Sequence, residues 1–373
     1  MTELHLAVGL DGYGWHPHAW RYAFAHNATG GGHLSGRYWG ALAGVAERGL
    51  LDFLTIDDSF DAQPGRRPEI SPRRLAGRAD AVLVAARVAP VTRHIGLVPV
   101  ATVTHTEPFH VSKAIATLDH ISHGRAGWQV RVSATAHEAA LVGRGSRIEA
   151  DELFDEAADA VEVARRLWDS WEDDAVIRDV ATGRYIDRDK LHYIDFAGKY
   201  FSVKGPSITP RPPQGQPVVL ALAHASRVYE FAAAGADVVL ITPHDDDSLR
   251  SILRDVAQAQ RATGRSLKVF ADLVVSLAED PLTPAAAISS DAHVFAGSAR
   301  HLVELLLRWQ NTGVDGVRLR PAVNAIDLPL IVDELVPALQ RAGVFRTAYR
   351  DGETLRERLE LASAPNRYAA VAR

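Results

Sequence analysis

The sequence contains no cysteine among its 373 residues. It can therefore form no disulfide, no thiolate metal site and no cysteine nucleophile. It also lacks an apolar run of the roughly 20 residues that a membrane-spanning helix needs, and its N-terminus does not resemble a signal segment. No excess of basic residues is present either, because the formal net charge is −5, which argues against nucleic acid as the main partner. We expect a soluble protein, and the cytoplasmic location that we assign rests on the missing signal alone.

Short apolar segments alternate with helix-like segments along most of the chain. We expect eight strands, at Leu4–Leu10, Phe53–Asp57, Ile95–Val103, Gly127–Val132, Val218–Ala223, Val238–Thr242, Lys268–Leu277 and Gly316–Leu319. Helical periodicity fills most of the gaps, at Pro72–Arg87, Glu149–Trp171, Ser226–Ala234, Ser248–Thr263, Ala299–Asn311 and Leu328–Ala342. Eight strands that alternate with helices predict a closed (β/α)₈ barrel, the TIM barrel, rather than an open sheet.

One polar, proline-rich stretch, residues 172–216, interrupts this alternation. It contains two short strand-like pieces, Leu191–Phe196 and Tyr200–Val203. We expect it to be an insertion between the fourth helix and the fifth strand of the barrel. Residues 1–373 would then form a single domain, as barrels of this length commonly do.

Polar residues gather where the expected strands end. In such barrels the chemistry takes place at the carboxyl ends of the strands, on the loops that lead into the helices. A single loop histidine would mean little, but histidines follow four of the strands. The polar residues at these ends are His16, His18, Asp57, Asp58, Thr102, Thr104, His105, Gln129, Ser133, His224, His244, Arg318 and Arg320. We expect the ligand pocket here and not in residues 172–216.

Several motifs resemble one enzyme family. The segment Phe109–Val130, FHVSKAIATLDHISHGRAGWQV, is similar to the nitrilotriacetate and alkanesulfonate monooxygenase branch of the bacterial luciferase-like flavoproteins. The N-terminal LHLAVGLDGYGWHPHAWR, the motif LWDSWEDDA at Leu167–Ala175 and the segment GKYFSVKGPSITPRPPQGQPVV at Gly198–Val219 also resemble that branch. The resemblance covers most of the chain.

The resemblance implies a two-component monooxygenase with the luciferase-like fold. A separate flavin reductase would supply reduced FMN, which reacts with O₂ so that a small organic substrate is oxidised. In the relatives the flavin ring lies across the mouth of the barrel. It contacts the residues that match Asp58, Thr102, Thr104 and Gln129 of this chain. Gln129 stands where the family usually has asparagine, so the amide is kept on a longer side chain.

The resemblance also implies a phosphate site, and there the chain departs from the family. Ile148 stands where a tyrosine is expected, and His224 and Ala225 stand where serine hydroxyls hold the phosphate. A helix N-terminus still attracts an anion through its amides, and Arg144 or Arg147 could supply charge. His224 could donate to the phosphate when protonated or could fill its place. We therefore expect oxidised FMN to bind weakly.

Histidine and arginine side chains supply the remaining candidates. Imidazole titrates near neutrality, so His16 and His105 are the catalytic candidates for proton handling. The substrate candidates are His18, His244, Arg318 and Arg320. We expect only one of the two arginines, which share a strand, to face the pocket and bind a carboxylate or sulfonate. We also expect a homodimer.

Three alternatives remain open. A deazaflavin (F420)-dependent oxidoreductase on the same fold is the nearest, and a flavin-free companion subunit would not be an enzyme. His16, His18, His224 and His244 also mimic the imidazole ligands of barrel hydrolases, in which a divalent metal activates water. The expected fourth strand offers no lysine to complete such a site, so we expect no metal.

Overall fold

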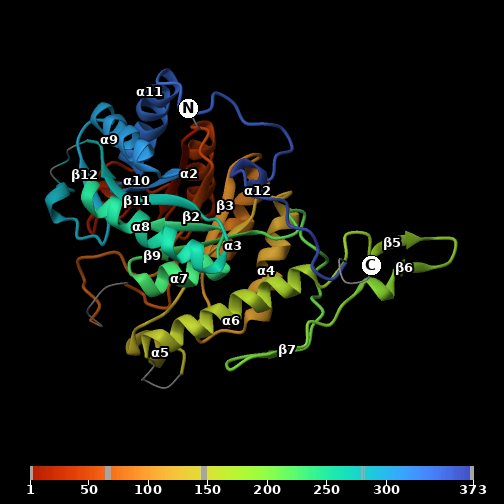
Figure 1. Ribbon diagram of the computed structural model, residues 1–373. Helices are drawn as coiled ribbons and strands as arrows, with labels where there is room; N and C mark the ends of the chain where they lie inside the picture. Colours follow the sequence, from red (N-terminus) through yellow and green to blue (C-terminus); the bar gives the residue numbers. More distant parts are fainter. Residues whose placement is uncertain (1–2, 64–68, 144–148, 279, 281, 370–373) are drawn as a thin grey trace.

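The computed structural model is a barrel of eight parallel strands surrounded by helices (Figure 1). It describes residues 3–63, 69–143, 149–278, 280 and 282–369. The barrel strands are β1 (His5–Leu10), β2 (Phe53–Ile56), β3 (Gly96–Thr102), β4 (Gly127–Arg131), β9 (Val218–Ala223), β10 (Val238–Ile241), β11 (Lys268–Ser276) and β13 (Gly316–Pro321). Pairing of β10 with β11 and of β1 with β13 closes the barrel, and β12 (His293–Ala296) pairs in parallel with the carboxyl half of β11. All eight predicted strands and the TIM-barrel fold are confirmed.

Helices cover the outside of the barrel (Figure 1). They are α1 (Ala19–Ala25), α2 (Gly36–Arg48), α3 (Ala81–Val88), α4 (Pro108–Ile121), α5 (Ala136–Leu141), α6 (Ala150–Asp169), α7 (Ser226–Gly235), α8 (Asp246–Thr263), α9 (Ala299–Thr312), α10 (Asn324–Leu330), α11 (Val336–Arg341) and α12 (Leu355–Arg358). A π-helical turn at Ile331–Leu335 joins α10 to α11, and short 3₁₀ turns lie at Ala89–Val91, Arg188–Lys190 and Ala285–Ala287. None of the described helices is long and apolar enough to cross a bilayer.

One predicted helix starts later than the sequence indicated. The expected helix over Pro72–Arg87 begins only at Ala81, because Gly77 has a φ of +85°, which an α-helix cannot accommodate. Asp80 then caps the new start, since its side chain accepts a hydrogen bond from the Leu83 amide at 2.8 Å.

Two small antiparallel sheets lie between α6 and β9, to one side of the barrel (Figure 1). Strand β5 (Val176–Asp179) pairs with β6 (Arg184–Ile186), and β7 (Phe196–Ala197) pairs with β8 (Ser202–Val203). The Trp171 indole anchors this segment, because its Nε1 donates to the Ser207 carbonyl at 2.8 Å. The Trp168 indole joins α6 to α4, because its Nε1 donates to the Ser112 carbonyl at 3.0 Å.

The barrel interior has an apolar lower part, at the amino ends of the strands. Phe53, Val98, Leu220, Leu240 and Phe270 are all fully buried there. Helix α12 closes this end with Leu355 and Leu359. A Cβ atom on Gly96 would lie 2.7 Å from the Leu355 side chain, so the closure needs glycine at that position. This apolar part separates the polar side chains of the upper end, where the strands finish, from buried polar residues at the lower end such as His5 and Asp52.

Candidate active site

A polar layer crosses the barrel interior directly above the apolar part. Thr55 and Asp272 each follow a buried phenylalanine of the same strand by two positions, so they point to the same side of the sheet. Arg318 lies in the middle of the layer and is 2% exposed. Its Nε and Nη2 donate to the two oxygens of Asp272, each at 2.7 Å, and its Nη1 donates to Gln129 Oε1 at 2.6 Å and to Thr55 Oγ1 at 3.2 Å. Every nitrogen of this predicted substrate ligand therefore already has a partner.

Arg320 lies one step above Arg318 and shares its carboxylate. Its Nε lies 3.1 Å from Asp272 Oδ2, and its Nη2 lies 3.1 Å from Asp291 Oδ1. The guanidinium also lies over the Trp15 ring, 4.8 Å from the centroid. The prediction that only one of the two arginines would face the barrel interior is wrong. Side chains two positions apart on a strand point to the same side, and both arginines reach Asp272.

The loop between β11 and β12 reaches across the upper end of the barrel. The Pro284 carbonyl of this loop lies 3.1 Å from His16 Nε2, and Asp291 contacts both Arg320 and His224. His224 Nε2 lies 3.3 Å from Asp291 Oδ2, and its Nδ1 lies 3.1 Å from Thr242 Oγ1. His16 after β1, His224 after β9 and Arg320 on β13 thus hold the described part of this loop.

His16 is buried, and both of its ring nitrogens have partners. Nδ1 accepts a hydrogen bond from the His18 amide at 2.9 Å, so Nε2 must carry the proton that it donates to the Pro284 carbonyl. Burial lowers the pKa of His16 below its ordinary value, although the bond to Pro284 opposes this shift. The structure therefore holds this predicted catalytic residue as a neutral imidazole of fixed orientation.

We predict that His16 titrates below its ordinary pKa of 6.5 and carries its proton on Nε2. The unfolded chain then binds a proton more readily than the folded chain, so this residue makes stability fall as the pH drops below about 6.5. Nitrogen-15 NMR of the histidine rings measures both properties, and His16→Gln identifies the signal. A pKa at or above 6.5, or a proton on Nδ1, would contradict the prediction.

Carboxylates and one arginine lie at the ends of β1 and β2. Arg78 Nη1 lies 3.0 Å from Asp57 Oδ2, and its Nη2 lies 3.4 Å from Asp11 Oδ2. The two oxygens of Asp58 accept from the amides of Ser59 at 2.7 Å and Ala81 at 3.0 Å, so Asp58 is fixed against the first turn of α3. Burial raises the pKa of Asp58, and it raises the pKa of Asp11 to about 6 against the opposing charge of Arg78.

The loops after β3 and β4 carry buried polar atoms without partners. Thr104 is fully buried, and its Oγ1 accepts from the Ser133 amide at 2.9 Å, which leaves its hydroxyl proton free to donate. Among the described residues, neither His105 Nε2 nor Arg131 Nε has a hydrogen-bond partner. Arg131 pairs in register with Thr102 on the neighbouring strand. A ligand seated at this end of the barrel could satisfy such atoms.

The family model for luciferase-like monooxygenases matches residues 21–299. The chain belongs to the luciferase-like monooxygenase family. It is 30% identical to nitrilotriacetate monooxygenase component A of Aminobacter aminovorans, over 98% of both chains. It is 28% identical to N-acetyl-S-(2-succino)cysteine monooxygenase of Bacillus subtilis, again over 98% of both. The crystal structure of a long-chain alkane monooxygenase shares the fold, with a TM-score of 0.84, 23% identity and full coverage of both chains. The predicted family and the prediction of an oxidoreductase enzyme are confirmed.

Only His224 and Ala225 of the residues considered for the phosphate site of this luciferase-like monooxygenase lie within the described part of the chain. Arg144, Arg147 and Ile148 lie outside the described residues. Ala225 is the N-cap residue of α7 and, being alanine, supplies no side-chain hydrogen bond to the first turn. His224 is turned toward Thr242 and Asp291, so a contact with phosphate would require it to leave Asp291.

The histidines do not gather as metal ligands would. No three histidine, aspartate or glutamate side chains of the described residues form a group that could hold a metal ion. His16 and His18 are neighbours, with ring centroids 5.5 Å apart, but His224 is paired with Asp291, and His244 lies exposed at the start of α8. The metal-hydrolase alternative therefore lacks a ligand set in this part of the chain.

Sequence reasoning missed Asp272 and Asp291, the acidic partners of the two arginines. One signal for Asp272 was present, because it is a charged residue within the apolar run Lys268–Leu277. A charge in a fully buried strand predicts an internal partner of opposite charge. Asp291 lies in a loop that carries no comparable pattern.

Proposed function

We propose that this enzyme is the oxygenase of a two-component system that receives reduced FMN from a separate reductase and uses O₂ to oxidise a small organic substrate. The observation that carries the proposal is the set of unpartnered buried polar atoms at the upper end of the barrel, His105 Nε2 and Arg131 Nε among the described residues. The similarity to nitrilotriacetate monooxygenase component A over nearly the whole chain supports it. When bound, the flavin would supply the electrons and the activation of oxygen.

The side chains at this end fit a flavin ring. Arg318 holds Gln129 Oε1, so the amide nitrogen of Gln129 is the group left for a ligand. Thr104 can donate its hydroxyl proton, because its oxygen already accepts from Ser133. These two donors suit the carbonyl oxygens and ring nitrogens of an isoalloxazine.

The first turn of α7 fits a phosphate through its backbone amides, although Ala225 supplies no side-chain group at the N-cap. Ala225 leaves the turn without a side-chain cap, so the free amides and the helix dipole would attract an anion. The hydroxyl that the family resemblance leads one to expect is missing at Ala225. We therefore propose that oxidised FMN binds weakly and that the flavin acts as a diffusible substrate.

The chain's own residues would shield and orient the reactants. The loop between β11 and β12 lies against His16, Arg320 and His224, which would limit the access of bulk water to the mouth. Of the two arginines, Arg320 would bind an anionic substrate group, which would replace Asp291 as the partner of its Nη2. His105 would handle protons, since its Nε2 has no partner among the described residues.

The same enzyme would form a homodimer through α3 and α4. A groove of about 470 Å³ between these helices is lined by Val82, Leu83, Val111 and Ala114, with Asp58 and Thr102 at one end. Leu83 is 70% exposed and lies within this mainly apolar groove, which suits contact with a second copy.

Anaerobic titration of the purified protein tests the proposed function. FMN in both redox states and the deazaflavin F420 are the probes, and reduced FMN is expected to bind most strongly. Oxygen consumption should then require both a flavin reductase and the reduced nicotinamide that the reductase uses.

A further inference from the structure

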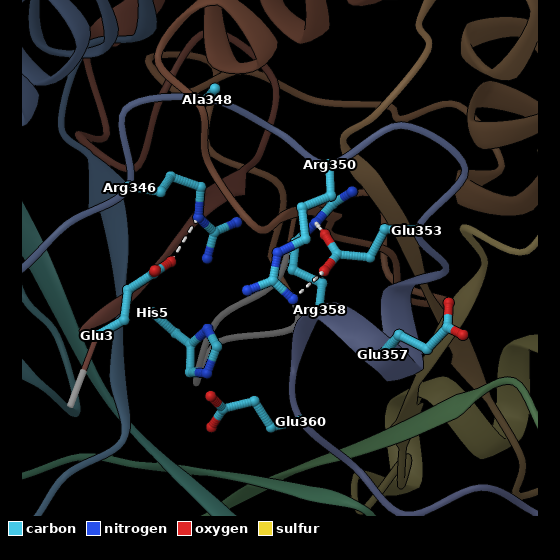
Figure 2. Close-up of a pocket in the computed structure, with 9 residues that line it drawn as sticks. All are labelled: Glu3, His5, Arg346, Ala348, Arg350, Glu353, Glu357, Arg358 and Glu360. Carbon is cyan, nitrogen blue, oxygen red and sulfur yellow. Dashed lines mark hydrogen bonds and ion pairs between the residues drawn. The ribbon is translucent and has the colours of Figure 1, made fainter.

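A charged cavity lies at the lower end of the barrel, beside the first residue of β1. Figure 2 shows the residues that line it. It has a volume of about 60 Å³ and is lined by Glu3, His5, Arg346, Ala348, Arg350, Glu353, Glu357, Arg358 and Glu360. One water needs on the order of 15 Å³ by the same measure, so the cavity has room for a few waters or one small ion. It is too small for a flavin.

Arg346 presents an unused donor to this cavity. Its Nε donates to Glu3 Oε1 at 2.8 Å, and its Nη2 donates to Asp52 Oδ1 at 2.6 Å. The side chain is 7% exposed, and among the described residues Nη1 has no hydrogen-bond partner. Figure 2 shows the guanidinium turned toward the cavity, above the His5 ring.

Asp52 fixes Arg346 in this position. It is fully buried and also accepts from the Leu6 amide at 2.7 Å and lies 3.0 Å from His5 Nδ1. Burial would raise the pKa of Asp52, but His5 and Arg346 outweigh it and lower the pKa to about 2. An ionised Asp52 holds Nη2 of Arg346 at all ordinary pH values, so Nη1 alone remains for a ligand.

Arg358 and Arg350 add positive charge to the same cavity. Arg358 is 2% exposed and donates through Nε to Glu353 and through Nη1 to the His94 carbonyl, which leaves Nη2 without a partner among the described residues. Arg350 is 86% exposed, and its nearest carboxylate oxygen, on Glu353, lies 3.7 Å away. In Figure 2 its guanidinium extends toward the middle of the group of lining residues.

The four glutamates that line the cavity already have hydrogen-bond partners within the protein. Their partners are Arg346 for Glu3, Arg358 for Glu353, Thr354 for Glu357, and Lys268 for Glu360. Two buried guanidinium nitrogens, Arg346 Nη1 and Arg358 Nη2, therefore lack a hydrogen-bond partner among the described residues. Both nitrogens can only donate.

We propose that this cavity binds one small tetrahedral oxyanion, of the size and charge of sulfate or phosphate, through Arg346 and Arg358, with Arg350 closing over it. Guanidinium groups match the oxygens of such an anion with charge-assisted hydrogen bonds. The bound anion would join Arg346 to Arg358 and so hold together the C-terminal segment 346–360, which closes the lower end of the barrel. It would thus stabilise the fold without touching the flavin site.

Isothermal titration calorimetry with sodium sulfate, and separately with sodium phosphate, at constant ionic strength tests this proposal. We expect one saturable site per chain. Arg346→Lys should weaken binding by about tenfold or more, because lysine keeps the charge but loses the second donor. Arg93→Lys, a matched change at an exposed arginine outside the cavity, should leave binding unchanged.

The two variants also separate this site from the candidate phosphate site at α7. Sulfate bound there would be unaffected by Arg346→Lys, and that result would overturn the proposal, as would the absence of saturable binding to the wild-type protein. If Arg346→Lys does not fold, crystals of the wild-type protein grown with sodium selenate give a second readout. An anomalous selenium peak beside Arg346 Nη1 supports the proposal, and its absence from an otherwise well-defined cavity contradicts it.

Discussion

Replacing Asp272 by asparagine should lower the free energy of unfolding by about 3–5 kcal/mol. Asp272 is fully buried and is the carboxylate that both Arg318 and Arg320 contact inside the barrel. Asparagine has nearly the same shape, but it removes the negative charge, which leaves the buried Arg318 without a carboxylate partner and Arg320 with Asp291 alone. Urea denaturation followed by circular dichroism measures the change.

The exposed ion pair between Arg48 and Asp333 provides the matched control. Both side chains are more than half exposed, so Asp333→Asn should cost less than about 1 kcal/mol. A loss below about 1 kcal/mol for Asp272→Asn as well would show that the polar layer does not depend on this carboxylate. The description of the barrel interior would then be wrong.

Replacing Ala225 by serine should strengthen the binding of oxidised FMN by about tenfold to a hundredfold. A hydrogen bond to a charged group contributes about 1.5–3 kcal/mol, and each 1.4 kcal/mol is a factor of ten in affinity. Serine would add a hydroxyl at the N-cap of α7, where Ala225 supplies no side-chain hydrogen bond. Fluorescence titration of FMN against the wild-type and variant proteins measures the effect.

Ala181→Ser serves as the control, because Ala181 is exposed in the turn between β5 and β6, away from the barrel. Tight binding of oxidised FMN to the wild-type protein, with no gain in Ala225→Ser, would show that other groups already hold the phosphate. The predicted weakness of the phosphate site would then be wrong.

The sequence was sufficient for the barrel, because its strands are short, mainly apolar runs that are buried on both faces. Periodicity could not place the start of α3, since the left-handed conformation of Gly77 depends on the path of the loop rather than on the helical pattern. The capping of α8 was predictable from local chemistry. The acidic run Asp245–Asp247 precedes and begins this helix. Its first residue, Asp245, is the N-cap, and the Asp245 side chain accepts a hydrogen bond from the Ser248 amide at 2.7 Å.

The candidate site was only partly predictable, because sequence position gives the end of a strand but not the partner of a side chain. Gln129 and Arg318 were assigned to different ligands, yet they bond to each other across the barrel at 2.6 Å. His224 was expected beside a phosphate, but Asp291 comes from a loop 67 residues later in the chain and holds its ring. Such pairings are set by the closure of the barrel, which brings together strands far apart in sequence.

Anaerobic titration with reduced FMN tests the central claim most directly, which is that the upper end of this barrel receives reduced flavin. The account predicts saturable binding of one reduced FMN per chain, stronger than that of oxidised FMN or F420. Thr104→Val should weaken this binding, and Arg350→Gln, at the opposite end of the barrel, should leave it unchanged. No saturable binding of FMN in either redox state, tighter binding of F420, or equal loss in both variants would contradict the account.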